Sequence, residues 1–438
     1  MKSVHLLMLG ISLLTGVLGF AQDITPLQNI DVQLFRYSEN RSPEKTYIHT
    51  DKDVYLIGET IWYKTYLVDG ISHSISDKSK VVYVELVSAL DSVLVKQKLL
   101  NENFGVAGNI ELNEALEPGD YTLRAYTKYM LNEKEPVIFS KQITIWRPNN
   151  DNNQTPKKVK EDEAEVYNVL QNDLVFDFYP EGGNLVYGIQ NTMGIKVTDT
   201  QGNEIATSGK IIDQNNTLIK DFETHEFGLG KFSYLPEIGS SYYASVNVNG
   251  QEKKFALPIP EKEGYVLNVV QNTEQITIKV TSNIADALKG ALLIGHMRGR
   301  VFLQHTKEFH EPSYLVRIPI EEVADGVAHF TLFTANGEPV CERLVFIDHP
   351  DNDNLLNITT AWPVYNKRQK VDVELGLESM AGEALVGSFS AAVISEAGLN
   401  NTFSNIESWL LLNSDVGGTI DNASFFFEEA SIKKRFLL

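Results

Sequence analysis

The sequence is poor in cysteine, because Cys341 is the only one in 438 residues. A disulfide needs two thiols, so no intrachain disulfide can form, and paired-cysteine zinc or redox motifs are excluded. The folded domains must therefore be held together by buried apolar surface. Cys341 lies in the strand-like run EPVCERL. We expect it to be a small buried apolar residue and not a reactive thiol.

Positive charge is also scarce. Lysine and arginine number 38 against 58 aspartates and glutamates, which gives a formal net charge of −20 at pH 7. An acidic surface of this size repels nucleic acids and anionic membranes, so we expect a protein partner and no nucleic acid. Beyond the start of the chain, no apolar run reaches the ~20 residues that a transmembrane helix needs.

Motifs that carry catalysis are absent as well. The sequence contains no HExxH, P-loop or GxSxG pattern. His225 in HEFGL and His310 in HEPSY begin like a zinc motif but lack its second histidine, so we expect surface or packing histidines. Asp348, Asp351 and Asp353 cluster between two domains. A calcium bridge is one interpretation of this cluster, and a solvated linker is the one we favour.

We therefore predict that the protein is not an enzyme. We expect no catalytic, cofactor-binding or metal-ligating residues, and no cofactor. The alternative is a glycosidase on a sandwich scaffold, which would need two carboxylates in fixed positions. Nothing in the sequence singles out such a pair among the 58 acidic residues.

The start of the chain has the pattern of a secretory signal peptide. Residues 1–21 begin with the positive Lys2, continue as an apolar run and end with the small residues Gly19 and Ala21. The run is too short to span a membrane comfortably. We predict cleavage before Gln22 and an exported protein that is periplasmic, outer-membrane-associated or extracellular.

The sequence is rich in β-strand patterning. Aromatic residues make up 10% of the chain, and aromatic and β-branched residues favour strands. From Thr60 to Val68 the side chains alternate, which predicts a strand with one face more buried than the other. The two sets are Ile61, Tyr63, Thr65 and Leu67 on one side, and Trp62, Lys64, Tyr66 and Val68 on the other.

The length favours several domains of ~100–150 residues each. We predict an all-β fold of serial immunoglobulin-like β-sandwich domains, of which the last is incomplete. A strand is expected at 388–395, and a short helix at 405–413 with Asn405 as its N-cap. The expected divisions are a signal peptide (1–21), an N-terminal extension (22–43), sandwiches (44–147, 174–260 and 265–348), a linker (148–173) and a partial sandwich with the helix (355–438).

Two smaller features have alternative interpretations. Tyr121 and Tyr242 follow turn residues near the ends of their domains, and we favour plain packing over a tyrosine-corner role. His49, Asp51 and Lys52 form a polar cluster between two strand-like runs. We expect this cluster to cap or orient the first strands, and binding is the alternative.

A family resemblance rests on the stretch from Glu44 to Gly70. Its pattern Y-x-H-T-D-K-x-x-Y-x-x-G-E-T-I-W-Y-K resembles the opening strands of the macroglobulin-like domain near the N-terminus of alpha-2-macroglobulin family proteins. The secreted Bacteroidetes type is most similar. The runs GDYTLRAYT and FYPEGGNLVYG extend the resemblance, which covers roughly Glu44 to Asn422. It implies serial macroglobulin-type sandwiches.

The resemblance also implies a function. In that family such domains form the scaffold of an endopeptidase inhibitor, and the Bacteroidetes type often continues into a TonB-dependent receptor plug domain, which this sequence lacks. The sequence also lacks the Gly-Cys-Gly-Glu-Gln thioester run, a bait region and a receptor-binding module. We expect a non-catalytic, inhibitor-like scaffold without a thioester. The alternative is a structural or partner-binding module at the bacterial outer membrane.

Overall fold

The structure, a computed structural model, describes most of the chain after the predicted signal peptide. The signal peptide itself, nearly all of the 148–173 linker, Asp351 and Asp353 lie outside the described residues. Strands predominate and are arranged in several small, mostly antiparallel sheets, which confirms the predicted all-β class. None of the helices in the described part combines the length and apolar character that crossing a bilayer requires. The described ranges are 26–102, 105–148, 174–308, 310–349, 355–394, 405–418, 420 and 422–427.

The first sandwich packs the sheet β1-β3-β6 against the sheet β2-β8-β7-β4-β5. The alternation predicted from Thr60 to Val68 is confirmed, because Ile61 and Leu67 are fully buried while Trp62 is 59% exposed. The strands are β1 (Glu44–Thr50), β2 (Val54–Leu56), β3 (Thr60–Asp69), β4 (Val81–Ser88), β5 (Val93–Leu100), β6 (Gly105–Glu111), β7 (Gly119–Tyr126) and β8 (Phe139–Trp146), and the short η1 (Met130–Asn132) lies between β7 and β8.

The second sandwich pairs the sheets β13-β10-β9 and β12-β11-β14-β15 around its own apolar core. Met193 and Ala244, one from each sheet, are fully buried there. The elements are β9 (Leu174–Pro180), β10 (Asn191–Asp199), β11 (Ser208–Asp213), β12 (Leu218–Glu223), η3 (Glu226–Gly228), β13 (Leu229–Tyr234), β14 (Tyr242–Val248) and β15 (Gln251–Ala256).

The third sandwich pairs the sheets β16-β17-β20 and β19-β18-β21-β22. Its core includes Cys341, which is only 4% exposed, so the expected buried position is confirmed. The elements are β16 (Tyr265–Gln271), β17 (Gln275–Ser282), β18 (Leu292–Met297), β19 (Arg300–Thr306), β20 (Ser313–Pro319), η4 (Ile320–Glu322), β21 (Gly326–Phe333) and β22 (Pro339–Ile347).

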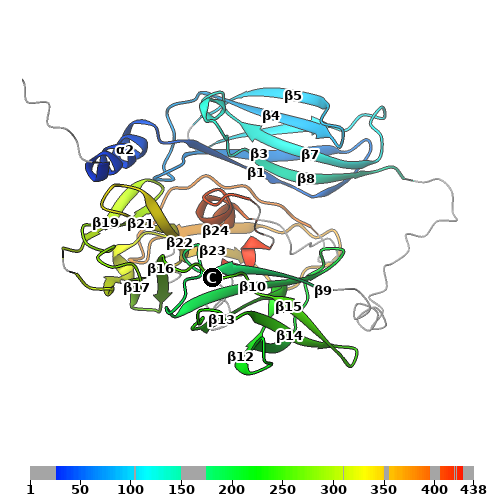
Figure 1. Cartoon of the computed structure of the whole chain (residues 1–438). Helices are drawn as coiled ribbons and strands as arrows, with labels where there is room; N and C mark the ends of the chain where they lie inside the picture. The colour runs from blue at the N-terminus through cyan, green and yellow to red at the C-terminus, as the bar shows by residue number, and fades with distance from the viewer. Residues whose placement is uncertain are drawn as a thin grey trace, which may run out of the picture.

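A helix precedes the first sandwich where the sequence indicated only a polar extension. This helix, α2 (Pro26–Asn40), begins with a proline, a residue whose fixed φ suits the first helical turn. It lies beside the third sandwich, where the Nε2 of Gln304 donates a hydrogen bond of 2.6 Å to Asp31 (Figure 1). The N-terminal segment thus reaches across to a domain that follows it by more than two hundred residues.

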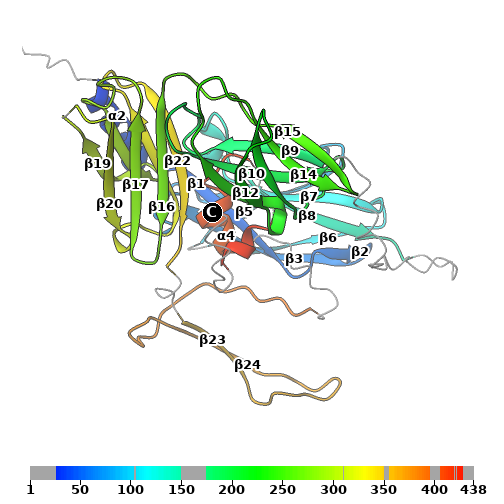
Figure 2. The ribbon, with the colours of Figure 1, turned by 60° about the horizontal axis from the view of Figure 1, so that its bottom comes forward.

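After the third sandwich the chain forms a two-stranded hairpin of β23 (Leu355–Thr360) and β24 (Val373–Glu378). The hairpin projects away from the three sandwiches (Figure 2). The prediction of a strand at 388–395 is wrong over the described residues 388–394, which join no sheet. The reason is that side chains of the first sandwich bind this segment against the face of a sheet.

The C-terminal segment, defined here as the described residues of 405–427, contains α4 (Ile406–Ser408), the π-helical turn η7 (Trp409–Asn413) and η8 (Ala423–Phe427). The predicted cap is confirmed, because the side chain of Asn405 accepts a hydrogen bond of 2.7 Å from the amide of Ser408. Sequence reasoning attached this helix to the fourth sandwich. It packs instead among the three complete sandwiches (Figures 1 and 2).

The two tyrosines with alternative interpretations combine both roles. Tyr121 and Tyr242 are 6% and 5% exposed, as packing requires. The hydroxyl of Tyr121 also donates a hydrogen bond of 2.5 Å to the carbonyl of Glu117, four residues upstream. The hydroxyl of Tyr242 accepts one of 2.9 Å from the amide of Glu237. This backward bond from a buried ring to the preceding backbone is the device of a tyrosine corner.

Candidate functional site

The C-terminal segment contacts all three sandwiches through aromatic side chains. Trp409 packs on the first sandwich, where its Nε1 donates a hydrogen bond of 2.8 Å to the carbonyl of Thr46. Phe427 meets Phe346 of the third sandwich, with ring centroids 5.1 Å apart. Phe425 meets a phenylalanine of the second sandwich at 5.0 Å. A short stretch of chain thus joins domains that lie far apart in sequence.

A buried group of charges lies at the centre of this junction. Asp415 of the C-terminal segment accepts from Lys45 of β1 at 2.5 Å and from Arg298, between β18 and β19, at 3.1 Å. The side chains of these three residues are only 8%, 5% and 11% exposed. The Nε of Arg298 also donates to the carbonyl of Ile71 at 3.1 Å. One carboxylate therefore balances two cations from two different sandwiches.

Burial determines the ionisation of the groups around this cluster. It lowers the pKa of Lys45, and the carboxylate of Asp415 opposes that shift. His73, whose Nε2 lies 3.4 Å from the Nζ of Lys45, has a pKa lowered to about 3 by burial and by the two neighbouring cations. His73 is therefore neutral at physiological pH and adds no third positive charge.

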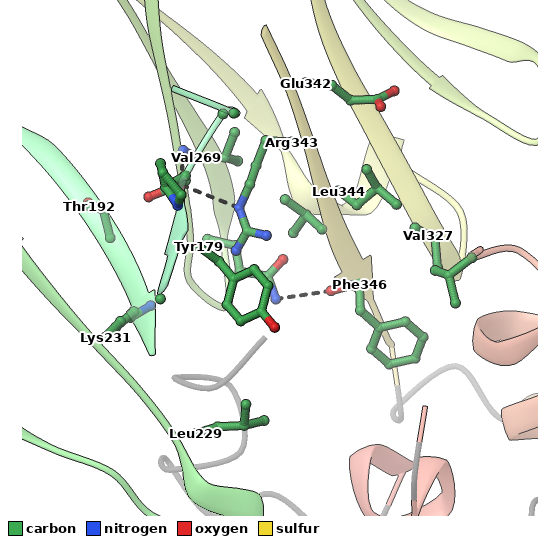
Figure 3. A pocket seen from close by; sticks show the side chains of 18 of the residues that line it. Tyr179, Thr192, Leu229, Lys231, Val269, Val327, Glu342, Arg343, Leu344 and Phe346 are labelled. Carbon is green, nitrogen blue, oxygen red and sulfur yellow. Dashed lines mark hydrogen bonds and ion pairs between the residues drawn. The ribbon is translucent and has the colours of Figure 1, made fainter. Parts of the chain in front are cut away.

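A cavity of about 580 Å³ lies among the second sandwich, the third sandwich and the C-terminal segment. In Figure 3, Tyr179 lies between Lys231 of the second sandwich and Phe346 of the third. The described residues that line it include no histidine, serine or cysteine. Leu412 and Val416 of the C-terminal segment complete the wall.

The PEGG run identified in the sequence forms the joint beside this cavity. Glu181 accepts hydrogen bonds from the amide of Val269 at 2.9 Å and from the side chain of Asn268 at 3.2 Å, both in β16. Gly182 has φ +82°, and a Cβ there would lie 2.8 Å from the carbonyl oxygen of Leu267. Only glycine combines this left-handed backbone with so close an approach of two domains.

Charged side chains cross the same joint. Arg343 of β22 lies 3.4 Å from Glu181, and its ion pair connects the third sandwich to the second. Burial and the positive charge of Arg343 lower the pKa of Lys231, while the carboxylate of Glu181 opposes this shift. The cavity is large enough for a small ligand. Its charges, however, already balance one another across the domain boundary, as a structural joint requires.

The predicted polar cluster at the start of the first sandwich orients strands, as expected. Asp51 accepts hydrogen bonds from the hydroxyl of Tyr55 at 2.6 Å and from the amide of Trp62 at 3.0 Å. Lys52 pairs with Glu59 at 2.7 Å across the β2–β3 turn. His49 does not join this set. It points to the outer face of the sheet, where it contacts Ser390 at 2.7 Å.

The other residues singled out in the sequence lie apart from one another. His225 is 3.8 Å from Glu223, and His310 is 2.5 Å from Asp286 in a different sandwich. Burial raises the pKa of the Cys341 thiol to about 12, which keeps it protonated. No group of three or more potential metal ligands occurs within the described ranges.

Sequence reasoning missed the junction residues Lys45, Arg298 and Asp415. One signal was present, because Glu44 and Lys45 open a strand whose other residues are mostly apolar or β-branched. Both side chains are buried, and Glu44 accepts hydrogen bonds from three neighbours within the first sandwich. Charged residues are almost never buried without partners. Two charged residues at the start of a strand that is expected to be buried could therefore have indicated contacts with another part of the chain.

Comparison with protein-family models and with curated protein sequences finds no match to this chain. Among solved structures, elastase-activated alpha-2-macroglobulin of Escherichia coli is similar at 12% identity and a TM-score of 0.25, over 77% of this chain and 33% of that one. Methylamine-reacted Salmonella alpha-2-macroglobulin is similar at 12% identity and a TM-score of 0.21, over 77% and 25%.

Latent PorU of Porphyromonas gingivalis is similar at 9% identity and a TM-score of 0.29, over 70% of this chain and 34% of that one. The chain therefore spans a quarter to about a third of the length of these three proteins. The assignment of serial β-sandwiches rests on the sheets and cores described above.

Proposed function

We propose that this chain is a non-catalytic, exported, macroglobulin-like scaffold that acts by binding another protein. The observation that carries the proposal is the uncovered face of the hairpin β23–β24. The residues facing each other across the two strands are Leu356 and Leu377, Ile358 and Leu375, and Thr360 and Val373. Directly paired residues share one face of a sheet, so this face is almost wholly apolar.

This apolar face is open to solvent. Ile358 is 63% exposed and Val373 is 54% exposed. The opposite face carries Asn357, Thr359 and Glu374, as a solvated face should. A contiguous exposed apolar patch is typical of a protein interaction site. The fastened sandwiches give this hairpin a firm base from which to project (Figure 2).

The expected place of action is the periplasm, the outer membrane or the cell exterior, and the support for it is the signal-peptide pattern of residues 1–21. The narrower proposal is a scaffold of the secreted Bacteroidetes type that inhibits endopeptidases. Its support is the family resemblance of the stretch from Glu44 to Gly70. Amino-terminal sequencing of the exported protein tests the location, and the expected first residue is Gln22.

Binding by the hairpin is tested with paired charge substitutions. Ile358→Glu with Leu375→Glu places two charges on the apolar face, and Asn357→Glu, opposite Gly376, places one on the polar face as a control. The full chain is immobilised and exposed to solubilised outer-membrane protein. We expect capture of a partner to fall about tenfold or more in the apolar-face variant, as loss of central apolar contacts does elsewhere, and to persist in the control.

Equal capture by both variants would remove the hairpin from the proposed function. Parallel assays with trypsin-like and elastase-like endopeptidases test the narrower form. Dose-dependent loss of peptidase activity would support inhibition, whereas unchanged activity beside hairpin-dependent capture would leave the chain as a partner-binding scaffold alone.

A further inference from the structure

The outer face of the first sandwich binds an extended piece of chain from the region after the third sandwich, which was predicted to be a partial sandwich (355–438). Lys64 of β3 donates a hydrogen bond of 2.6 Å to the hydroxyl of Ser388. The hydroxyl of Ser390 contacts two groups, the Nδ1 of His49 and the hydroxyl of Tyr66, each at 2.7 Å. His49 and Lys64 are directly paired across β1 and β3, so these groups lie side by side on one face.

The seated segment, residues 388–390, binds through alternate side chains. Ser388 and Ser390 are half-buried and turn toward the sheet, while Phe389 between them is 43% exposed. Lys64 also donates to the carbonyl of Phe389 at 3.0 Å. The contacts thus require an extended backbone with small hydroxyl side chains two residues apart, and they place no demand on the residue between them.

The surface of the first sandwich that binds residues 388–390 is larger than the segment that occupies it. A cavity of about 410 Å³ remains beside the segment, lined among others by Trp62, Asn109 and Ala391. Trp62 is 59% exposed at its rim. An exposed tryptophan beside unfilled space can anchor a bulkier side chain than the alanine that the chain itself supplies. The surface therefore fits a ligand that fills more of it.

We propose that this face is a docking site for an extended segment of a partner protein, and that residues 388–390 are a built-in occupant which the partner displaces. The partner's segment carries a serine or an acidic residue at the place of Ser388 and a larger residue at the place of Ala391. An acidic residue would form a charge-assisted bond with Lys64, which is stronger than the bond to a neutral hydroxyl. A second copy of this acidic chain is disfavoured by its net charge of −20.

The seated segment competes from within the same molecule, at a high effective concentration. The test therefore begins with a variant in which the seated segment binds the site more weakly. A fluorescent peptide with the sequence of residues 384–394 is titrated into the full chain and into the variant Ser388→Ala with Ser390→Ala. We expect the variant to bind the peptide about tenfold more tightly or better, because each lost hydroxyl contact is worth roughly a fivefold factor in occupancy.

Site variants are made in that double-alanine background. Lys64→Ala should weaken peptide binding by about tenfold, and Tyr66→Phe, which removes one hydroxyl only, by about fivefold. The matched control is Lys98→Ala, an exposed lysine on β5 of the same sandwich, which should have no effect. A peptide with aspartate in place of Ser388 should bind more tightly than the parent peptide.

Two results would overturn the proposal. One is peptide binding that is equal in the wild-type chain and the double-alanine variant, or that is indifferent to Lys64. The other is a wild-type dimer that dissociates when Ser388 and Ser390 are replaced, because the segments would then exchange between copies and not with a partner. Neither result bears on the apolar face of the hairpin, because the docking site proposed here lies on the first sandwich.

Discussion

Replacement of Asp415 by asparagine should loosen the junction of the sandwiches. The carboxylate is 8% exposed and is the acidic partner of both Lys45 and Arg298, whose side chains are 5% and 11% exposed. Removing the charge leaves two buried cations without their counter-ion, and breaking a buried pair in this way typically costs ~3–5 kcal/mol. Arg298 keeps two backbone carbonyl acceptors, so we expect a value near the lower end, about 3 kcal/mol.

Hydrogen exchange of the backbone amides in η7 measures this cost, because it reports the free energy of local opening without requiring the whole chain to unfold in one step. The matched control is Asp372→Asn, which breaks an ion pair to Lys370 whose side chains are 73% and 82% exposed. Exposed pairs contribute ~0–1 kcal/mol, so η7 should be unaffected. An equal loss of protection in both variants would refute the role assigned to Asp415.

Three further predictions concern single positions. Burial of Glu85 is outweighed by hydrogen bonds from a lysine, a tyrosine and an arginine, so its pKa falls to about 2. The free energy of unfolding of the first sandwich should therefore fall by roughly 2 kcal/mol as the pH falls from 4.5 to 2. Acid titration of the Glu85→Gln variant should lack this loss. Gly182→Ala should lower the thermal midpoint more than Gly183→Ala, since both have positive φ but only the first meets Leu267; equal effects would contradict the close approach. Cys341 should resist alkylation at pH 8 until the chain unfolds, and rapid labelling of the folded protein would contradict its burial.

Strand character and fold class could be predicted because they depend on local patterning. The alternation from Thr60 to Val68 places its buried residues where a period of two requires, and the cap at Asn405 follows from a side chain and an amide three residues apart. The buried position of Cys341 follows in the same way from its strand-like surroundings. Each of these features is determined within one element or one turn.

Contacts between distant segments could not be predicted, because nothing in the local pattern says which surface an element will meet. The run at 388–394 has a strand-like composition. Its hydrogen-bonding partners, however, are side chains of the first sandwich, namely those of His49, Lys64 and Tyr66. The PEGG run signals a turn, but its glutamate serves β16 of the next domain. Helix α2 lacks acidic residues in its first turn and basic residues in its last, so the proline at its start was the main terminal signal.

The placement of the sequence signatures supports the proposed scaffold. Residues of the run around His49 and Lys64 hold another part of the chain, and Glu181 of the PEGG run holds the neighbouring sandwich. Asp415 joins two sandwiches by the same kind of contact. A catalytic site concentrates its unusual residues around one reacting atom. Here they are distributed over the boundaries between units, where they fix relative position. In the proposed function, such a framework presents two surfaces to a second protein, the apolar face of the hairpin and the face of the first sandwich under residues 388–390.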